Sequence, residues 1–181
     1  MDQATFWSLL DTLAKIGMGA LLLAIGLWFA HYRKPSQPAS PESIAAKRKL
    51  KIYEEVSRQM GNVSHSFAKY SALVIESVRF GARWPQARRA ELDNINNELV
   101  QEFRRMADAE ANLLLIGEKG LEKNLRLYGA QIALFRKQVY VGRRDISNQE
   151  IADLKQDIYK LREQFYDVLS KKYDDNVRKS A

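Results

Sequence analysis

The chain has 181 residues, a formal net charge of +7, no cysteine and two histidines. The absence of cysteine excludes a disulfide framework, a thiolate metal site and a thiol nucleophile, and it fits a reducing compartment. The positive charge is uneven, because residues 31–51 hold six basic side chains against the single acidic residue Glu42.

The first predicted element is a membrane-spanning helix within residues 6–32. Residues 16–30 carry no charge, but at the helical rise they cover only about 22 Å of a bilayer core of about 30 Å. The span therefore extends back past Asp11 and Lys15, which lie four apart on one helical face and can pair. These two charges either begin in the interface or serve a function within the membrane. No basic residue precedes the apolar stretch and no small-residue cleavage site follows it, so we expect an uncleaved anchor.

Basic residues concentrate after this span and set its predicted orientation. They are Arg33, Lys34, Lys47, Arg48, Lys49 and Lys51. The positive-inside rule places the N-terminus outside and the C-terminal domain in the cytoplasm, at the inner (plasma) membrane. We expect these side chains to contact anionic lipid headgroups, at about 1 kcal/mol each. A nucleic-acid partner is not expected, because it would not need the charge beside the membrane.

Small residues within the span predict contact between membrane helices. Gly19, Gly26 and Ala30 are spaced seven and then four residues apart, so they recur on one helical face. Such residues allow helix backbones to approach closely. Gly and Ala are also common in membrane helices generally, so both self-association and a solitary anchor stay open.

A proline repeat separates the predicted anchor, residues 1–34, from the rest of the chain. Pro35, Pro38 and Pro41 recur every third residue, which matches the three-residue turn of polyproline II. Residues 35–41 should therefore form a semi-rigid linker. The same letters contain a P-x-x-P motif of the kind that SH3-like modules bind.

Residues 42–181 show helical periodicity throughout, in four runs whose apolar residues alternate in steps of three and four. The runs are Tyr53, Val56, Met60, Val63, Phe67, Tyr70, Val74 and Ser77; Leu92, Ile95, Leu99, Phe103, Met106, Leu113 and Ile116; Leu121, Leu125, Tyr128, Ile132, Phe135 and Val139; and Ile151, Leu154, Ile158, Leu161, Phe165 and Val168. No alternating run with turn signals interrupts them, so we expect no strands.

Breaker and capping residues set the expected helix boundaries. These are Gly81 and the Trp84-Pro85 bond, Gly117 to Gly120, Gly142, and a capping box of Ser147 with Glu150. The short connections favour antiparallel neighbours, so the predicted fold is all-α, a cytoplasmic antiparallel four-helix bundle behind a single transmembrane helix. The first helix, of about 38 residues and about 57 Å, should project its basic start, Lys47 to Lys51, as a stalk. Gly129 lies inside the third helix, where a close backbone approach would require it.

The sequence offers no recognisable catalytic chemistry. His31 and His65 have no partner at metal-ligand spacing, and we expect both at a surface or boundary. The glycines at 117 and 120 lack phosphate-loop spacing and indicate a turn. The carboxylates, including Glu98 and Glu102, lack the accompanying Glu-x-x-His pattern of a di-iron bundle. We therefore expect no enzyme activity, no metal and no cofactor.

An up-and-down bundle would gather arginines at the end far from the membrane. They are Arg79, Arg83, Arg88, Arg89, Arg143 and Arg144, with Trp84 among them. Guanidinium groups bind phosphate in a bidentate manner and an indole can stack on a base, so this cluster is a candidate site for a nucleotide-like anion or an acidic protein. The alternative is a solvated basic rim in which Arg79 pairs with Glu76 and Trp84 caps the core.

Two functions follow from these expectations. The first is a non-enzymatic membrane protein whose bundle self-associates or docks a partner. The alternative is a ligand-gated membrane effector or sensor, in which an anionic small molecule on the arginines alters the bundle and the change reaches the anchor. A coiled coil with its domain outside the cytoplasm is a weaker reading, because the distribution of basic residues opposes it.

Overall fold

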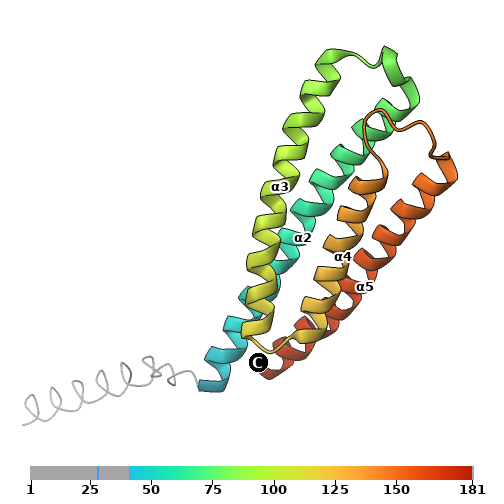
Figure 1. The fold of residues 1–181 in the computed structure, drawn as a ribbon. Coiled ribbons are helices and arrows are strands. Elements are labelled where there is room, and N and C mark those ends of the chain that lie inside the picture. The colour runs from blue at the N-terminus through green and yellow to red at the C-terminus, as the bar shows by residue number, and fades with distance from the viewer. Residues whose placement is uncertain (1–27, 29–40, 181) are drawn as a thin grey trace, which may run out of the picture. The chain divides into compact units, whose positions relative to one another are not determined.

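The described part of the chain is all-helical. The computed structural model describes Trp28 and residues 41–180, and there it contains no strand. The elements of Figure 1 are α2 (Pro41–Phe80), the short 3-10 helix η1 (Gly81–Arg83), α3 (Gln86–Leu115), α4 (Lys119–Gln138) and α5 (Asn148–Ser180). The prediction of four helices without strands is thereby confirmed for these residues.

Contacts between helices show an up-and-down arrangement. Ser66 of α2 bonds to Glu98 of α3, whereas Tyr53, earlier in α2, bonds to Glu118 beyond the end of α3. A residue later in α2 therefore bonds to an earlier residue of the following segment, so α2 and α3 are antiparallel. In Figure 1, α4 and α5 continue the alternation, and the α2–α3 and α4–α5 connections lie at the same end of the bundle.

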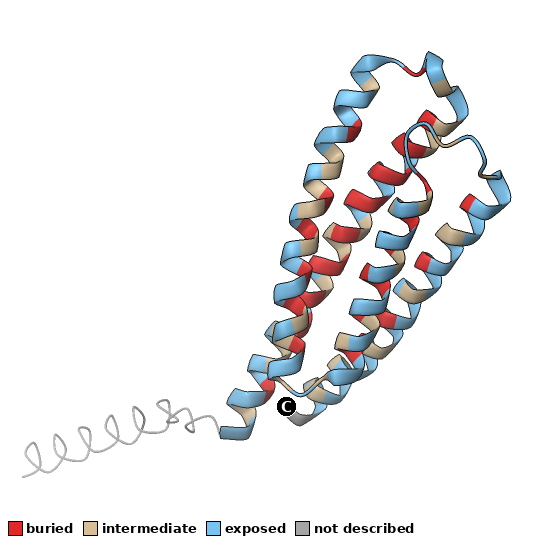
Figure 2. Ribbon diagram, viewed as in Figure 1, coloured by how far each residue is buried: buried red, intermediate tan, exposed pale blue. Residues whose placement is uncertain are grey.

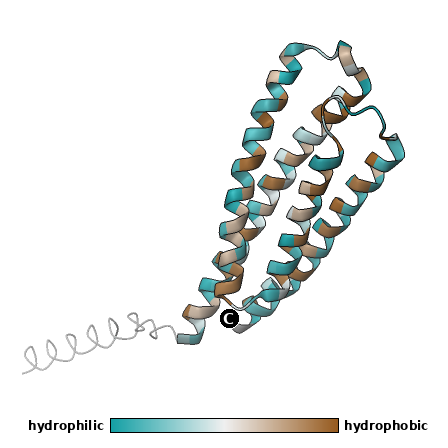
Figure 3. Cartoon of the chain, in the orientation of Figure 1, coloured by the Kyte–Doolittle hydropathy of each residue, from teal (hydrophilic) through white to brown (hydrophobic). Residues whose placement is uncertain are grey.

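The core follows the predicted apolar seams. All eight seam residues of α2 are buried, as are the six of the third run. Figures 2 and 3 show the buried and the hydrophobic residues of the helices turned toward one another. At the centre, the rings of Phe67 and Phe135 meet edge to face with their centroids 5.1 Å apart. The prediction that the seam aromatics form the core holds for these rings, and the geometry is one that aromatic pairs prefer.

The helix ends mostly follow the breakers and caps. Gly81, Gly117 and Gly142 have positive φ values of 56°, 79° and 92°, which a side chain would disfavour. The capping box is confirmed, because the Glu150 amide donates to Ser147 Oγ at 3.1 Å and the Ser147 amide donates to Glu150 Oε2 at 2.7 Å. Gly120 departs from the prediction, since α4 already begins at Lys119 and this glycine lies in its first turn.

Two further predictions differ in outcome. Gly129 does mark a close approach, but of side chains and not of backbone as predicted, because a Cβ there would lie 2.3 Å from Met106 Cε, the flexible end of a side chain of α3. The stalk prediction is wrong, because Ala46 is buried and Leu50 packs against the core. The basic start of α2 therefore lies along the bundle. It does so because Ala46 and Leu50 extend the apolar face of α2 by about two turns before Tyr53.

The predicted anchor, linker and their boundaries lie outside the described residues. The membrane span within 6–32, its charge pair and the linker at 35–41 therefore stay predictions. Among the residues that the structure does describe, none of the helices is both long enough and apolar enough to cross a bilayer.

Two glycines make a matched test of this packing. A Cβ at Gly61 of α2 would meet nothing within 4 Å, whereas one at Gly129 would meet Met106. We expect Gly61→Ala to raise the free energy of unfolding by about 0.5–1 kcal/mol and Gly129→Val to lower it by about 1–3 kcal/mol through overpacking. Urea unfolding followed by circular dichroism measures both. Equal effects at the two sites would contradict the close approach of α3 and α4.

Candidate functional site

A groove lies between α2 and α5. It has a volume of about 590 Å³ and is lined by Tyr53, Glu54, Ser57, Tyr166, Asp167, Leu169, Ser170, Tyr173 and Asp174. Tyr53 and Leu169 are buried and form an apolar floor. The lining includes carboxylates from both helices and no basic residue. The groove is therefore apolar inside and negatively charged at its rim.

Tyrosine hydroxyls hold the two walls of this groove together. Tyr166 of α5 donates to the carbonyl oxygen of Ser57 at 3.3 Å, and Tyr173 donates to Glu54 Oε1 at 3.1 Å. The bond to the Glu54 carboxylate raises the pKa of the Tyr173 hydroxyl. The Tyr173 hydroxyl therefore stays protonated at neutral pH, and the two hydrogen bonds together fix the spacing of α2 and α5 along the groove.

At the lower end of the groove, Tyr53 anchors the α3–α4 turn. Its hydroxyl donates to Glu118 Oε1 at 2.8 Å, and Lys172 of α5 lies 3.1 Å from Glu118 Oε2. Burial, reinforced by the hydrogen bond to Glu118, raises the pKa of the Tyr53 hydroxyl. The Tyr53 bond and the Lys172 ion pair together connect α2, α5 and the α3–α4 turn through Glu118.

The predicted arginine cluster spans two neighbouring connections at the other end of the bundle. A small hollow of about 140 Å³ there is lined by Ser77, Gly81, Ala82, Arg89, Val141, Gly142, Arg143 and Arg144. The fold thus brings Arg89 beside Arg143 and Arg144, although 54 or more residues separate them in sequence. We call this end of the bundle the arginine end. It forms because the α2–α3 and α4–α5 connections lie at the same end of the bundle (Figure 1).

Two of the six arginines are already paired. Arg88 lies between Glu76 and Glu91, bonding to a carboxylate oxygen of each. Arg143 lies 3.1 Å from Asp145 and also donates to the carbonyl oxygen of Gln138. Within the described part of the chain, no ion pair involves the other four, which are exposed: Arg79, Arg83, Arg89 and Arg144.

Trp84 does not present a surface for stacking. The residue is only 3% exposed and belongs to the core, and its indole Nε1 donates to Glu76 Oε1 at 3.1 Å. Arg88, and secondarily Trp84, hold the pKa of Glu76 below its usual range. The alternative in which Trp84 caps the core therefore describes this residue correctly. Its expected Arg79–Glu76 pair is replaced by Arg88–Glu76, because the chain reversal brings α3 back over Glu76.

Other exposed apolar residues near the arginines were missed by the sequence reasoning. Phe80, Tyr140 and Val141 are exposed large hydrophobics that flank the glycines of the two connections. The sequence does contain a signal for two of them. Phe80 and Tyr140 are aromatic residues that follow the last residues of their apolar seams, Ser77 and Val139, and so do not belong to the core pattern. These rings, and not Trp84, are the aromatic surfaces that the arginine end offers to a ligand.

The remaining predicted site residues divide between described and undescribed segments. Lys47, Arg48 and Lys51 are exposed on α2, and Lys49 is half-buried. The other membrane-surface residues, Arg33 and Lys34, lie outside the described residues, as do Gly19, Gly26 and Ala30 of the proposed helix contact.

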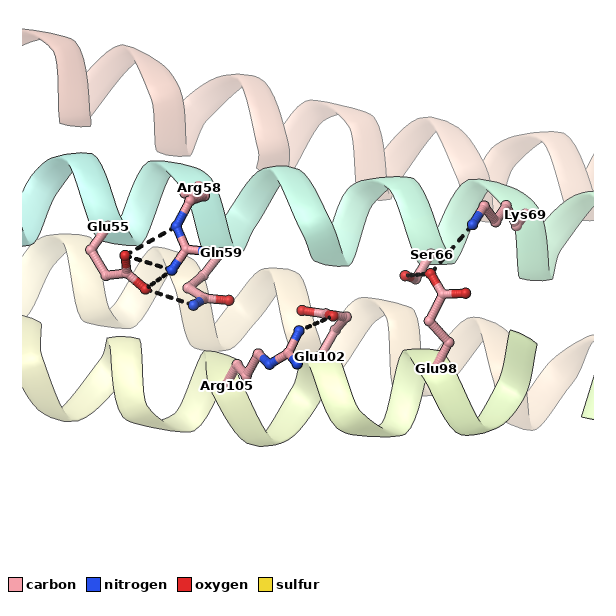
Figure 4. A network of polar contacts seen from close by, with 8 residues as sticks. All are labelled: Glu55, Arg58, Gln59, Ser66, Lys69, Glu98, Glu102 and Arg105. Atoms are coloured by element: carbon pink, nitrogen blue, oxygen red, sulfur yellow. Dashed lines mark hydrogen bonds and ion pairs between the residues drawn. The ribbon is translucent and has the colours of Figure 1, made fainter. Parts of the chain in front are cut away.

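Polar contacts join α2 to α3, as Figure 4 shows. Ser66 of α2 donates to Glu98 Oε1 of α3 at 2.7 Å, and within α3 Glu102 accepts a bond of 2.6 Å from Arg105. Glu102 is 7% exposed, and neither its Oε2 nor Gln59 Oε1 has a hydrogen-bond partner. His65 is exposed, as expected of a surface histidine. In residues 41–180, the acidic and histidine side chains form no group of metal-binding geometry.

Comparison of the chain with protein-family models, with curated proteins and with solved structures gave no match. The function therefore has to be inferred from the groove, the arginine end and the exposed surfaces of this chain.

The Ser66–Glu98 bond predicts a pH-dependent contribution to stability. Ser66, followed by Lys69, lowers the pKa of Glu98 below its usual 4.5. A carboxylate with a lowered pKa stabilises the fold above its unfolded pKa, and the gain is lost as the pH falls through the folded value. We expect Ser66→Ala to cost about 1 kcal/mol at neutral pH, at the low end for a charged hydrogen bond because Glu98 is partly exposed.

The measurement is urea unfolding of both proteins at neutral pH and at about pH 3, where the difference should shrink toward zero. Ser71→Ala is the matched control, since Ser71 is buried but donates to the uncharged Ala68 carbonyl oxygen. Its cost should be the same at both pH values. A Ser66→Ala effect that is independent of pH would contradict the assignment.

Proposed function

We propose that this chain is a non-enzymatic, single-pass membrane protein whose cytoplasmic helical bundle docks a protein partner or a second copy at the membrane. The observation that supports the docking role best is the α2–α5 groove, because it combines an apolar floor with a rim of carboxylates. The membrane location rests on the apolar stretch within residues 6–32 and on the basic residues after it.

The chemistry of the groove indicates what kind of segment it accepts. Glu54, Asp167 and Asp174 lie along the rim and are exposed. A partner that carries lysine or arginine complements this charge, and complementary charge favours both the rate and the specificity of association. The floor of Tyr53 and Leu169 receives an apolar side chain. A basic amphipathic helix, which places both kinds of residue on one face, fits best.

Self-association has two sources in this proposal. Gly19, Gly26 and Ala30 allow close contact between two membrane spans. The exposed basic residues Lys47 and Lys51 of another copy have the charge that the acidic groove requires. A contact in the membrane and a contact between bundles would act together, because the first raises the effective concentration for the second.

Site-specific cross-linking in cells tests the docking groove and the orientation together. The chain has no cysteine, so Ser170→Cys provides a single attachment point in the groove for a photoreactive maleimide. Asn97→Cys on the exposed face of α3 is the matched control. We expect a discrete adduct from position 170 only, whose cross-linked peptide is rich in lysine or arginine. The double variant Asp167→Lys, Asp174→Lys should abolish it.

The outcomes separate the parts of the proposal. A peptide from the same chain assigns self-association, and one from another protein assigns partner docking. Charge reversal at Asp93 and Asp108, exposed on α3, should leave the adduct unchanged. No adduct above that of position 97 would contradict the docking groove. Labelling of position 170 by an impermeant maleimide in intact cells would contradict the cytoplasmic location.

A second candidate function is a ligand-gated effector, favoured by the hollow at the arginine end. Its volume of about 140 Å³ suits a phosphate group and is too small for a whole nucleotide. Arg89 and Arg144 line it without an ion-pair partner among the described residues. A nucleotide would place a phosphate there and its base on an exposed ring, Phe80 or Tyr140. The ligand class is thus a phosphate with an optional aromatic group.

Calorimetric titration of the purified chain with pyrophosphate tests this alternative. Charge-assisted hydrogen bonds contribute about 1.5–3 kcal/mol each, so Arg89→Ala with Arg144→Ala should weaken binding at least about a hundredfold. Arg104→Ala with Arg178→Ala removes the same charge from exposed positions elsewhere and should have little effect. Equal losses in both double variants, or no binding to the unaltered chain, would exclude the hollow as a phosphate site.

A further inference from the structure

The α3–α4 turn exposes apolar side chains at the end of the bundle where α2 begins. Leu114 is 51% exposed and Leu115 is 69% exposed, the highest value among the large hydrophobic residues that the structure describes at this end. Ile44, in the first turns of α2, is 58% exposed. Figure 1 shows the start of α2, the α3–α4 turn and the end of α5 at the same end of the bundle. We refer to Leu114 and Leu115 as the apolar tip.

Basic side chains flank this tip. Leu115 and Ile116 share a hollow of about 310 Å³ with Ala45, Arg48 and Lys49 of α2. Lys47 and Lys51 are exposed on the same turns, and Lys119 follows the tip. Acidic groups also lie nearby: Glu42 at the start of α2, Glu110 on α3, Glu118, Glu122 in the first turn of α4, and Asp174 and Asp175 on α5. Glu118 is already bonded to Tyr53 and Lys172, and Glu122 lies 3.5 Å from Arg126. Basic residues dominate on the α2 side.

Two backbone carbonyl groups at the apolar tip are hydrogen-bonded within the chain, which suits an apolar environment. The Gly117 amide donates to the Leu114 carbonyl oxygen at 3.0 Å, and the Glu118 amide donates to that of Leu113 at 2.8 Å. These two bonds form a Schellman motif, with Gly117 at a φ of 79°. They satisfy carbonyl groups that a helix end otherwise leaves to water. Entry of the tip into a bilayer interface therefore strands fewer polar backbone groups.

We propose that this end of the bundle docks on an anionic lipid bilayer, with Leu114 and Leu115 among the headgroups and Arg48 and Lys49 on lipid phosphates. The proposal rests on the proposed membrane location, since residues 35–41 join α2 to the predicted span. A bilayer fits better than a protein, because the exposed leucines at the end of α3 lie beside basic residues of α2, and this basic rim complements anionic lipid.

The experiment uses the full chain in vesicles, with one cysteine that carries an environment-sensitive fluorophore. Leu115→Cys reports on the tip, and Leu134→Cys is the control, because Leu134 is also an exposed leucine but lies on α4 toward the arginine end. In vesicles of phosphatidylcholine with phosphatidylglycerol, we expect a blue-shifted emission that brominated lipids quench at position 115 and not at 134. Circular dichroism confirms that both variants keep the helical content of the parent.

Two further variants separate the contribution of the basic residues from that of the inserted leucines. In the Leu115→Cys background, Arg48→Gln and Lys49→Gln should each lower the ratio of docked to free bundle about fivefold, as about 1 kcal/mol per lipid-facing charge implies. Quenching that is as strong in pure phosphatidylcholine would overturn the role of the basic rim. A blue shift without lipid quenching would assign the tip to a protein contact and overturn docking, as would a water-like emission in anionic vesicles.

Alkaline extraction of the same vesicles tests the anchor independently. A chain that resists extraction but shows no quenching at position 115 overturns docking and leaves the anchor standing. A chain that is extracted but is quenched at position 115 before extraction supports docking and contradicts the anchor.

Discussion

The apolar face of α2 is the constraint on which the rest of the molecule depends. This 40-residue helix contacts each of the others, through Ser66 with α3, Phe67 with α4 and Ser57 with α5. Buried residues run along almost the whole length of α2. The register of α2 against the other helices therefore determines how they align with it at both ends of the bundle. Tyr53 holds the α3–α4 turn, and Glu76 holds the start of α3. A slip of one helical turn along this face would separate both pairs at once.

The three contacts of α2 differ in chemistry, and this difference decides where the candidate sites lie. Toward α4 the contact is aromatic and apolar, so it is rigid. Toward α3 it includes hydrogen bonds to two carboxylates, from Ser66 and Lys69 to Glu98 and from Arg88 to Glu76. Toward α5 it is bridged by tyrosine hydroxyls that leave a groove beside them. A single stiff helix thus supports an acidic groove along its length, an arginine end and an apolar tip.

The sequence predicted the elements well because period, breakers and caps act locally. The seams of α2 and α4, the Gly81 boundary and the Ser147 cap all depend on residues within about two helical turns. The failures concern side chains that meet across a chain reversal. Glu76 pairs with Arg88 and not Arg79, and Trp84 is buried, because the direction in which α3 leaves the turn decides both. The groove was missed because its tyrosines repeat at core spacing, whereas Leu114 and Leu115, between Leu113 and Ile116, were detectable as leucines off the seam.

The buried face of α3 is less uniformly apolar than that of α2. Its buried residues include Glu102, with an oxygen that lacks a partner, and the small Ala109, whereas α2 buries a continuous apolar face. The 30 residues of α3, about 45 Å in length, begin among the arginines and end at the apolar tip. A phosphate at the arginine end and a bilayer at the apolar tip, as proposed above, would therefore contact opposite ends of one helix, and any effect of one on the binding of the other would be reciprocal.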